Sequence, residues 1–172
     1  DKSPISACGR YLLSLRTNFL DRLPGPDDTA EIVVFDLQKD DQSYSVIGVT
    51  HCFNWQQGCQ MQWLGPGFSS KVIYNDFRDN KFVSVLYDIE HRTETVFPEA
   101  IYAMCPSGKY GYCIDYERHF WCRRGYSYSN VEDAQKNKFI VPNDGINVID
   151  FETGQVEKIL TVEELNKIKP LK

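Results

Sequence analysis

A turn–strand unit recurs three times along this chain, and the recurrence limits the folds that the chain can adopt. In each copy a glycine-containing turn carries a cation and leads into a segment in which apolar and polar residues alternate. Alternation with a period of two indicates strands with one buried face, and glycine and proline supply the backbone angles of tight turns. The strand segments are residues 11–16, 72–76 and 110–115.

An apolar run that ends in aspartate forms the second part of each copy. The aspartates are Asp36, Asp88 and Asp150, and each is followed by polar turn residues and a further short strand. An aspartate in this position accepts hydrogen bonds from the amides of the next turn, which explains Asp-x-x-Thr-Gly at 150–154 in structural terms. The spacing of about fifty to sixty residues is close to the length of a four-stranded propeller blade.

The recurrence predicts an all-β, β-propeller-type repeat of four-stranded antiparallel blades, with about three blades in the chain. We expect one propeller-type domain over residues 1–172, with blades at 1–52, 53–100 and 101–160 and a short helix at 161–168. Thr161 and Glu164 have the spacing of a capping box for that helix. The alternative is a β-sandwich, a fold that has no reason to repeat the same two signatures in order.

The middle copy contains the predicted innermost hairpin, with a strand at 59–64, a Gly-Pro-Gly turn and a strand at 72–76. Two insertions interrupt the repeats. Residues 18–29 form a proline- and acid-rich loop, and residues 117–144 form a longer loop whose first part is too aromatic for a plain linker. Its later part, 130–138, is polar and is expected to be mobile. Loops of this length in a compact domain tend to be functional or disordered.

Composition argues against several classes of protein. The 13% aromatic content and the net charge of −5 exclude a disordered chain, and the lack of a basic patch disfavours nucleic-acid binding. No apolar run approaches the roughly 18 residues of a membrane span. The chain starts at Asp1 without a signal-peptide pattern, which fits a soluble fragment or a chain whose targeting segment has been removed, and leaves the compartment open.

The six cysteines are expected to be reduced structural thiols. The alternatives are a disulfide between Cys105 and Cys113, whose segments could face each other across a hairpin, and a bridge between Cys52 and Cys59. No CxxC pair is present and the three histidines are scattered, so the spacing of a zinc site is missing. Neither a nucleophile elbow nor a phosphate loop is present.

The turns and the Asp-x-x-Thr-Gly sequence resemble those of TolB-like and oligogalacturonate-lyase-like β-propellers, over nearly the whole chain. The segments 54–58 and 124–128 are similar to a group of such propellers, mostly uncharacterised and bacterial. The chain departs from the pattern at Cys8, where aspartate commonly sits in the turn, and at Arg124, where proline is expected. The resemblance implies six to eight blades in a complete member, so we expect further blades or a second chain to close the two open flanks.

The first candidate site is the loop that precedes the predicted innermost strand. It contains an aromatic residue beside two amides, which suits a sugar because the indole face packs on the ring and the amides bind hydroxyls. The alternative is that Trp55 packs between blades and that the glutamines are solvated. The site residues are His51, Trp55, Gln56 and Gln57.

The second candidate site lies in the 117–144 insertion. Guanidinium groups bind carboxylates in bidentate fashion, so this cluster suits an acidic sugar or an acidic protein segment. The alternative is a surface loop whose arginines pair with nearby acidic residues. The site residues are Arg118, His119, Arg123, Arg124, Tyr126 and Tyr128.

These features predict a non-catalytic binding or scaffold module without a cofactor, with an acidic carbohydrate or a protein segment as its ligand. The alternative, which the resemblance implies, is a segment of an oligogalacturonate-type lyase that acts by β-elimination with a divalent metal. Its metal ligands would lie mostly outside this stretch. A purely structural segment without a ligand is the third possibility.

Overall fold

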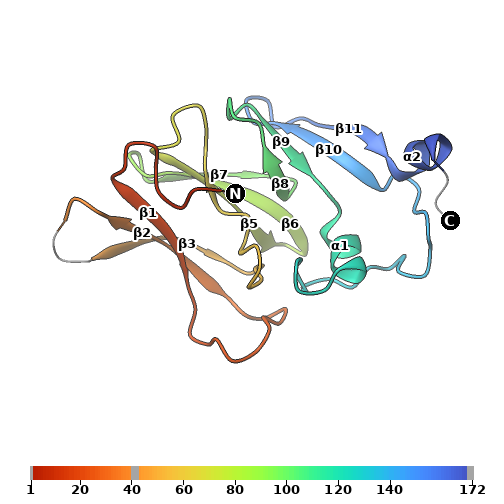
Figure 1. Cartoon of the computed structure of the whole chain (residues 1–172), viewed down its shortest axis with the longest axis horizontal. Helices are drawn as coiled ribbons and strands as arrows, with labels where there is room; N and C mark the ends of the chain where they lie inside the picture. The colour runs from red at the N-terminus through yellow and green to blue at the C-terminus, as the bar shows by residue number, and fades with distance from the viewer. Residues whose placement is uncertain (1, 40–42, 170–172) are drawn as a thin grey trace.

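The computed structural model describes residues 2–39 and 43–169. Within these residues the strands form three antiparallel sheets, with the strand orders β1-β2-β3, β4-β5-β6-β7 and β11-β10-β9-β8. Neighbours in each sheet are neighbours in sequence, so each sheet is a meander, and the sheets follow one another along the long axis of the molecule (Figure 1). The prediction of an all-β fold is confirmed.

The first sheet consists of β1 (Tyr11–Arg16), β2 (Ala30–Asp36) and β3 (Tyr44–Thr50). Ile5 forms an isolated antiparallel bridge with Leu12, beside the free edge of β1. Leu13 and Ile32 lie on the face that packs against the middle sheet. The connection between β1 and β2 is the long loop that the sequence predicts.

The middle sheet consists of β4 (Gln62–Trp63), β5 (Lys71–Arg78), β6 (Lys81–Asp88) and β7 (Thr93–Phe97). Successive side chains of β5 enter two different cores, because side chains alternate between the faces of a strand. Tyr74 packs in the core shared with the first sheet, and Ile73 packs in the core shared with the third. β5 is therefore buried on both faces, and it carries the adjacent polar residues Asn75 and Asp76 into the interior.

The third sheet consists of β8 (Ile101–Met104), β9 (Tyr110–Cys113), β10 (Gly145–Asp150) and β11 (Val156–Thr161). It is followed by α2 (Val162–Ile168), which has the expected capping box between Thr161 and Glu164. The segment after β9 was predicted as a loop, but it begins with α1 (Tyr116–Cys122), which Asp115 caps by accepting a hydrogen bond from the Arg118 N–H. No helix within residues 2–39 and 43–169 is long and apolar enough to cross a membrane.

The repeated aspartates have the role that the sequence indicates. Asp36, Asp88 and Asp150 each accept a hydrogen bond from the backbone N–H two residues later, at 3.2, 3.0 and 2.8 Å. In the first two sheets the same carboxylate also faces the turn cation, with Arg10 at 2.8 Å from Asp36 and Lys71 at 3.9 Å from Asp88. The three copies therefore share a pattern of hydrogen bonds as well as a pattern of sequence.

The innermost strand of the middle sheet is shorter than predicted. The sequence indicates a strand at 59–64, but β4 contains only Gln62 and Trp63. Gln60 has a φ of 57°, in the left-handed region, which ends the extended backbone on its N-terminal side. Side-chain alternation alone does not reveal this break.

The cysteines are free thiols. Cys105 follows the end of β8 and its N–H donates to the Tyr110 carbonyl, three residues before Cys113 on β9, so the two cysteines lie about 10 Å apart along the strand at its usual rise. That separation contradicts the alternative of a Cys105–Cys113 disulfide, which needs Cα atoms within about 7 Å. Cys52 and Cys59 are buried and unbonded.

Candidate functional site

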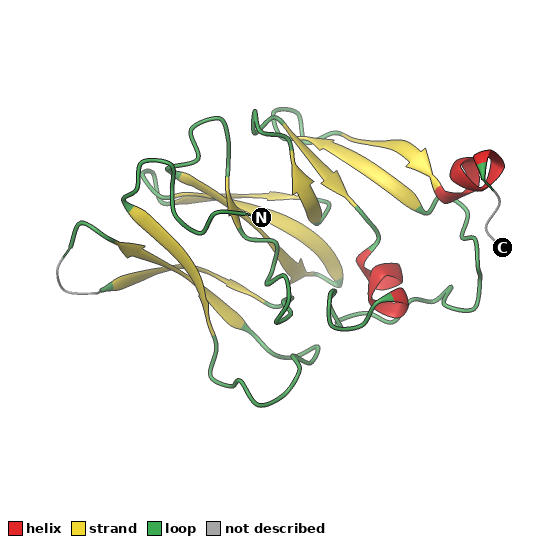
Figure 2. Cartoon of the chain, in the orientation of Figure 1, coloured by secondary structure: helices red, strands yellow, loops and turns green. Residues whose placement is uncertain are grey.

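Three long connections lie at the same end of the sheets. They are residues 17–29 between β1 and β2, 51–61 between β3 and β4, and 114–144 between β9 and β10. In an antiparallel meander, every second connection leaves from the same end of the sheet. Figure 2 shows these three loops along one side of the molecule. We call the surface formed by these three connections the loop face.

Hydrogen bonds join the three connections into one surface. The Trp55 indole N–H donates to the Arg22 carbonyl at 2.7 Å. The Asn130 amide donates to the carbonyls of His51 and Pro26, at 2.8 and 3.0 Å. Segments from the first and third sheets thus meet at the entry to the middle sheet.

The sequence Asn-Trp-Gln-Gln-Gly closes a tight loop on the loop face. The backbones of Asn54 and Gly58 exchange both hydrogen bonds, and Gly58 has a φ of 59°. The Asn54 side-chain oxygen accepts from the N–H groups of Gln56 and Gln57, at 3.0 and 2.7 Å. The loop is held by its own side chain, and Trp55 lies at its tip.

The predicted sugar-binding residues of this loop differ in their surroundings. Trp55 is 38% exposed, and it packs edge-on against Phe53 and Phe19. Gln56 is exposed, whereas the Gln57 side chain accepts a hydrogen bond from Gln60. Trp55 is therefore both a packing residue and a surface residue.

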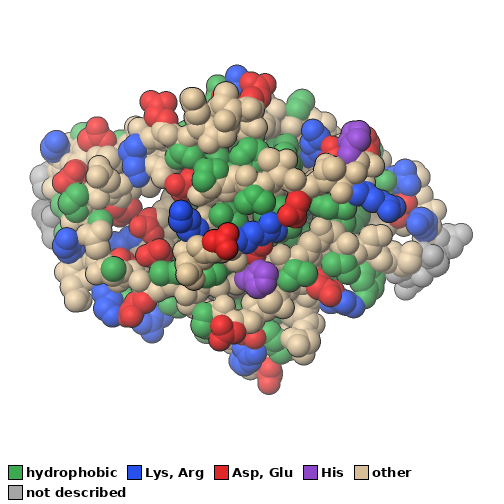
Figure 3. Space-filling model, turned by 180° about the vertical axis from the view of Figure 1, so that it is seen from behind, with side chains coloured by type: hydrophobic (Ala, Val, Ile, Leu, Met, Phe, Trp, Pro, Cys, Tyr) green, Lys and Arg blue, Asp and Glu red, His purple; other side chains and the backbone are tan. Residues whose placement is uncertain are grey.

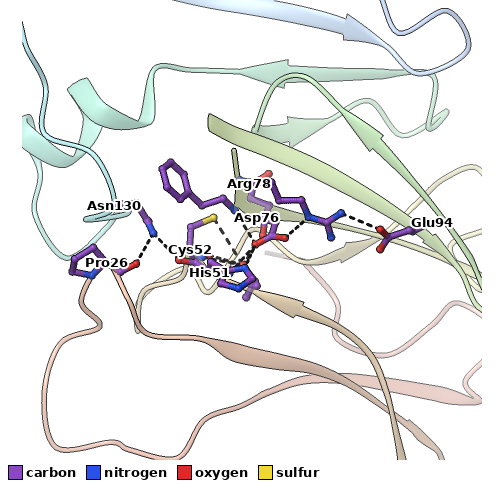
Figure 4. Close-up of polar contacts among 10 residues, drawn as sticks. Pro26, His51, Cys52, Asp76, Arg78, Glu94 and Asn130 are labelled. Atoms are coloured by element: carbon purple, nitrogen blue, oxygen red, sulfur yellow. Dashed lines mark hydrogen bonds and ion pairs between the residues drawn. The ribbon is translucent and has the colours of Figure 1, made fainter. Parts of the chain in front are cut away.

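His51 lies against a buried carboxylate. Its Nδ1 is 3.0 Å from Oδ1 of Asp76, and its backbone N–H donates to the same oxygen at 2.8 Å. The Arg78 guanidinium donates to the other oxygen of Asp76 at 2.6 Å and to Glu94 at 3.0 Å. Figure 4 shows these four residues as a chain that runs from the His51 ring to β7. Asp76 thereby holds His51 through its backbone N–H and through one ring nitrogen, while half of the side chain stays in solvent.

Two residues of the predicted carboxylate-binding cluster have structural partners instead. The Arg118 guanidinium, 14% exposed, lies 3.0 Å from Asp133 and donates to three backbone carbonyls of residues 135–139. Tyr128 is 1% exposed and stacks on Tyr116, and burial raises its pKa well above the usual value. Both residues stabilise the 114–144 connection.

Arg22 of the loop face and Arg78 at the end of β5 are also paired with acids. Arg22 lies 2.5 Å from Asp28, and Arg78 has Asp76 and Glu94. On the face that Figure 3 shows, acidic and basic side chains accordingly lie next to each other and do not gather by sign. The other two of the four loop-face arginines are exceptions, because they have no carboxylate partner within the described residues.

Arg123 and Arg124 are such exceptions. Both are exposed, and neither forms an ion pair with any acidic residue in the part of the chain that the structure describes. The Arg123 guanidinium lies 4.4 Å from the ring centre of Tyr126, and that of Arg124 lies 5.7 Å from the ring centre of Trp121. We call these four residues the arginine cluster; Tyr126 was predicted as a site residue, and Trp121 was not.

His119 is half-buried beneath this cluster. Its ring contacts Tyr102 and Tyr116 edge-on, and its buried Nδ1 has no hydrogen-bond partner within the described ranges. Burial, and secondarily the charge of Arg123, lower its pKa. His119 is therefore held neutral near the surface.

A cavity of about 590 Å³ lies between the middle and third sheets, lined by residues outside the predicted sites. Its walls carry the carboxyl groups of Glu99, Glu117 and Asp144, each with a pKa raised first by burial and also by the charge of Asp115. This negative lining disfavours an anionic ligand. Sequence reasoning missed the cavity because its walls come from segments that are far apart in the chain.

Within the described residues, no group of three or more histidine, cysteine or acidic side chains is arranged so that it could hold a metal ion. A metal at this surface would need ligands from elsewhere. The candidate site on the loop face therefore consists of the oriented His51, the Trp55 loop and the arginine cluster.

No protein-family model matches this sequence, and no curated protein matches it. Two solved structures are similar in fold. The apo AtxE2 isopeptidase has a TM-score of 0.50 at 12% identity, over 98% of this chain and 30% of that one. A serine-to-alanine variant of the AtxE2 isopeptidase with Astexin3-dC4 bound has a TM-score of 0.50 at 13% identity, over 97% and 30%. The chain thus spans about 30% of the length of these enzymes, and the likeness bears on the fold alone.

Proposed function

We propose that this chain supplies three blades of a β-propeller and that its loop face binds an acidic carbohydrate. Two observations support the propeller arrangement. Consecutive sheets pack face to face through separate cores, and the same aspartate turn closes each of them. Further blades, or a second chain, would close the two open flanks.

The unpaired arginines carry the proposal for the ligand. Arg123 and Arg124 are exposed and lie over the rings of Tyr126 and Trp121, so each is held in place without a carboxylate. A guanidinium in this state can bind a carboxylate through two parallel hydrogen bonds. The neighbouring aromatic rings suit the apolar faces of sugar rings.

The Trp55 loop extends the same surface. Asn130, six residues after Arg124, donates to the His51 carbonyl, so the segment that carries the arginines adjoins that loop. An oligosaccharide lying across both would meet carboxylate-binding groups at one end and amides at the other. This arrangement fits an extended ligand better than a small anion.

Calorimetry with trigalacturonate tests the proposal. We expect Arg124→Gln to weaken binding about tenfold, since one charge-assisted hydrogen-bonded pair is lost. Arg92→Gln is the matched control, because Arg92 is also exposed and lies in the β6–β7 turn, outside the connections that form the loop face. Equal affinities for the wild type and both variants would refute the proposed site.

The His51–Asp76 pair favours a second function, a lyase that removes a proton next to the sugar carboxylate. A histidine oriented by a buried carboxylate has the geometry of a general base. The two functions differ in their products and in metal dependence. A lyase would generate an unsaturated uronate, seen by absorbance, and would lose this activity with a chelator, whereas the binding module would bind trigalacturonate equally well with and without chelator.

A further inference from the structure

The outward nitrogen of His51 makes no hydrogen bond in the described part of the chain. The His51 side chain is 51% exposed, whereas the Asp76 side chain that holds Nδ1 is 1% exposed. No residue within 2–39 and 43–169 forms a hydrogen bond with Nε2. The structure therefore fixes one nitrogen of the ring and leaves the other open on the loop face.

The surroundings of Asp76 decide which nitrogen carries the proton. Asp76 accepts hydrogen bonds from the N–H groups of His51 and Phe77 and from the Arg78 guanidinium. A carboxylate with these donors is ionised and can only accept, so the His51 Nδ1 must donate. In the neutral ring Nε2 then holds the lone pair and is an acceptor.

We infer that Asp76 is a positioning residue that fixes His51 with Nε2 as an outward hydrogen-bond acceptor, and that Nε2 receives a hydroxyl group of the loop-face ligand. The inference rests on the proposed function and deepens it. The arginine cluster binds the carboxylate of the sugar, and His51 recognises its hydroxyls. A fixed acceptor discriminates because a site that pairs with a hydroxyl rejects the analogue that lacks it.

A second histidine of the chain provides a matched control. His91 also has Nδ1 near a carboxylate, 3.1 Å from Asp88, but its side chain is 73% exposed and the two residues are only three apart. This pair belongs to the β6–β7 turn, outside the three connections that form the loop face. His91 therefore has a carboxylate next to Nδ1, as His51 does, but it does not lie on the loop face.

Nitrogen-15 NMR of the ring nitrogens tests the orienting role without any ligand. We expect His51 in the wild-type chain to show the Nδ1–H form as its major neutral tautomer. In Asp76→Asn we expect both tautomers, because an amide can either donate or accept, while His91 keeps its wild-type spectrum. A major Nε2–H form of His51 in the wild type overturns the inference.

Binding of trigalacturonate tests the hydroxyl contact. Asparagine in place of His51 retains a donor toward Asp76 and removes the acceptor at Nε2, so we expect His51→Asn to melt like the wild type and to bind about tenfold more weakly. His91→Asn should bind like the wild type. Unchanged affinity in a folded His51→Asn overturns the role of Nε2 in binding.

The two arms separate this inference from the proposed function. If the wild type shows the Nδ1–H form and binds no trigalacturonate, the proposed ligand is wrong and the role of Asp76 in orienting His51 is supported. If the wild type binds trigalacturonate and His51 shows the Nε2–H form, the proposed function stands and the inference is overturned.

Discussion

The buried side chain of Asn75 connects several parts of the fold. Its side chain exchanges two hydrogen bonds with the backbone of Ile101, both at 2.8 Å, as a peptide group in a sheet would. The same amide nitrogen lies 3.2 and 3.1 Å from the hydroxyls of Tyr116 and Tyr128. One buried amide thus joins the middle sheet, the start of the third sheet and α1.

We expect Asn75→Ala to lower the free energy of unfolding by about 3 kcal/mol, because several buried partners lose their hydrogen bonds at once. Urea unfolding followed by fluorescence measures the change. Ser84→Ala is the control, since the Ser84 hydroxyl is buried on the next strand and has no hydrogen-bond partner in the described part of the chain. Similar losses in both variants would contradict the role assigned to Asn75.

Asp28 gives the loop face a dependence on pH. Hydrogen bonds from Arg22, and secondarily from the Gly25 N–H, lower its pKa from 3.8 to about 2. A lowered pKa in the folded state means that Asp28 contributes stability above about pH 4, and that this contribution is lost as the pH falls toward 2. The Arg22 carbonyl binds Trp55, so the Trp55 loop depends on the same segment.

We expect an NMR titration of the Asp28 carboxyl group to give a pKa near 2 in the wild type, and a higher value in Arg22→Ala, in which the Gly25 N–H still lowers the pKa. Trp55 fluorescence should shift in the wild type between pH 4 and pH 2, and at higher pH in the variant. A normal pKa in the wild type would show that the Arg22–Asp28 pair does not persist in solution.

At the scale of elements, the sequence predicted the sheets better than the connections. The strands β1 and β9 begin at residues 11 and 110, where the predicted alternation begins, since each has one face that the pattern can report. The sequence did not predict α1, because its residues Tyr116, Phe120 and Trp121 are typical of strands. This preference outweighs the single helix signal, the N-cap residue Asp115. β4 was overextended, because the positive φ of Gln60 leaves no trace in the pattern.

The candidate site was predicted only in part, for a related reason. His51 and Asp76 meet although 25 residues separate them, and Asp76 looks like the end of a strand when it is considered alone. Arg118 and Arg124 have the same charge in the same segment, but only the fold shows that Arg118 faces Asp133. Contacts between distant segments decide which polar side chains have partners in the fold. The spacing of residues in the sequence does not reveal these contacts.

Arg118 is the residue that shapes the longest connection. Its guanidinium binds the Asp133 carboxylate and the carbonyls of Gln135, Lys138 and Phe139. The polar segment 130–138 is therefore anchored in the structure, although its sequence suggested mobility. A planar group with several donors can span these acceptors, and an ammonium cannot.

We expect Arg118→Lys to speed amide hydrogen exchange across residues 133–139 by about tenfold, which corresponds to about 1.4 kcal/mol of local stability. Arg123→Lys should leave the exchange of this segment unchanged, because the Arg123 guanidinium lies over the Tyr126 ring and forms no hydrogen bond with residues 133–139. Unaltered exchange in Arg118→Lys would show that the ion pair with Asp133 is sufficient by itself.

At the scale of the whole molecule, the two outermost sheet faces lack the partner that each inner face has. Tyr44 and Val46 are 41% and 48% exposed on the side of the first sheet that faces away from the middle sheet. Tyr112 is 38% exposed on the corresponding side of the third sheet. An exposed apolar sheet face favours association.

We therefore expect the purified chain to self-associate, with a light-scattering mass above 19.9 kDa that rises with concentration. Val46→Lys should lower this mass, since it places a charge on an apolar contact, whereas Lys81→Glu changes an exposed charge at the start of β6, in the middle sheet, and should not. Both variants should keep the wild-type circular dichroism spectrum, because both positions are exposed. A chain that stays monomeric at every concentration would show that its end faces are stable in water, and the argument for further blades would then rest on the repeated turns alone.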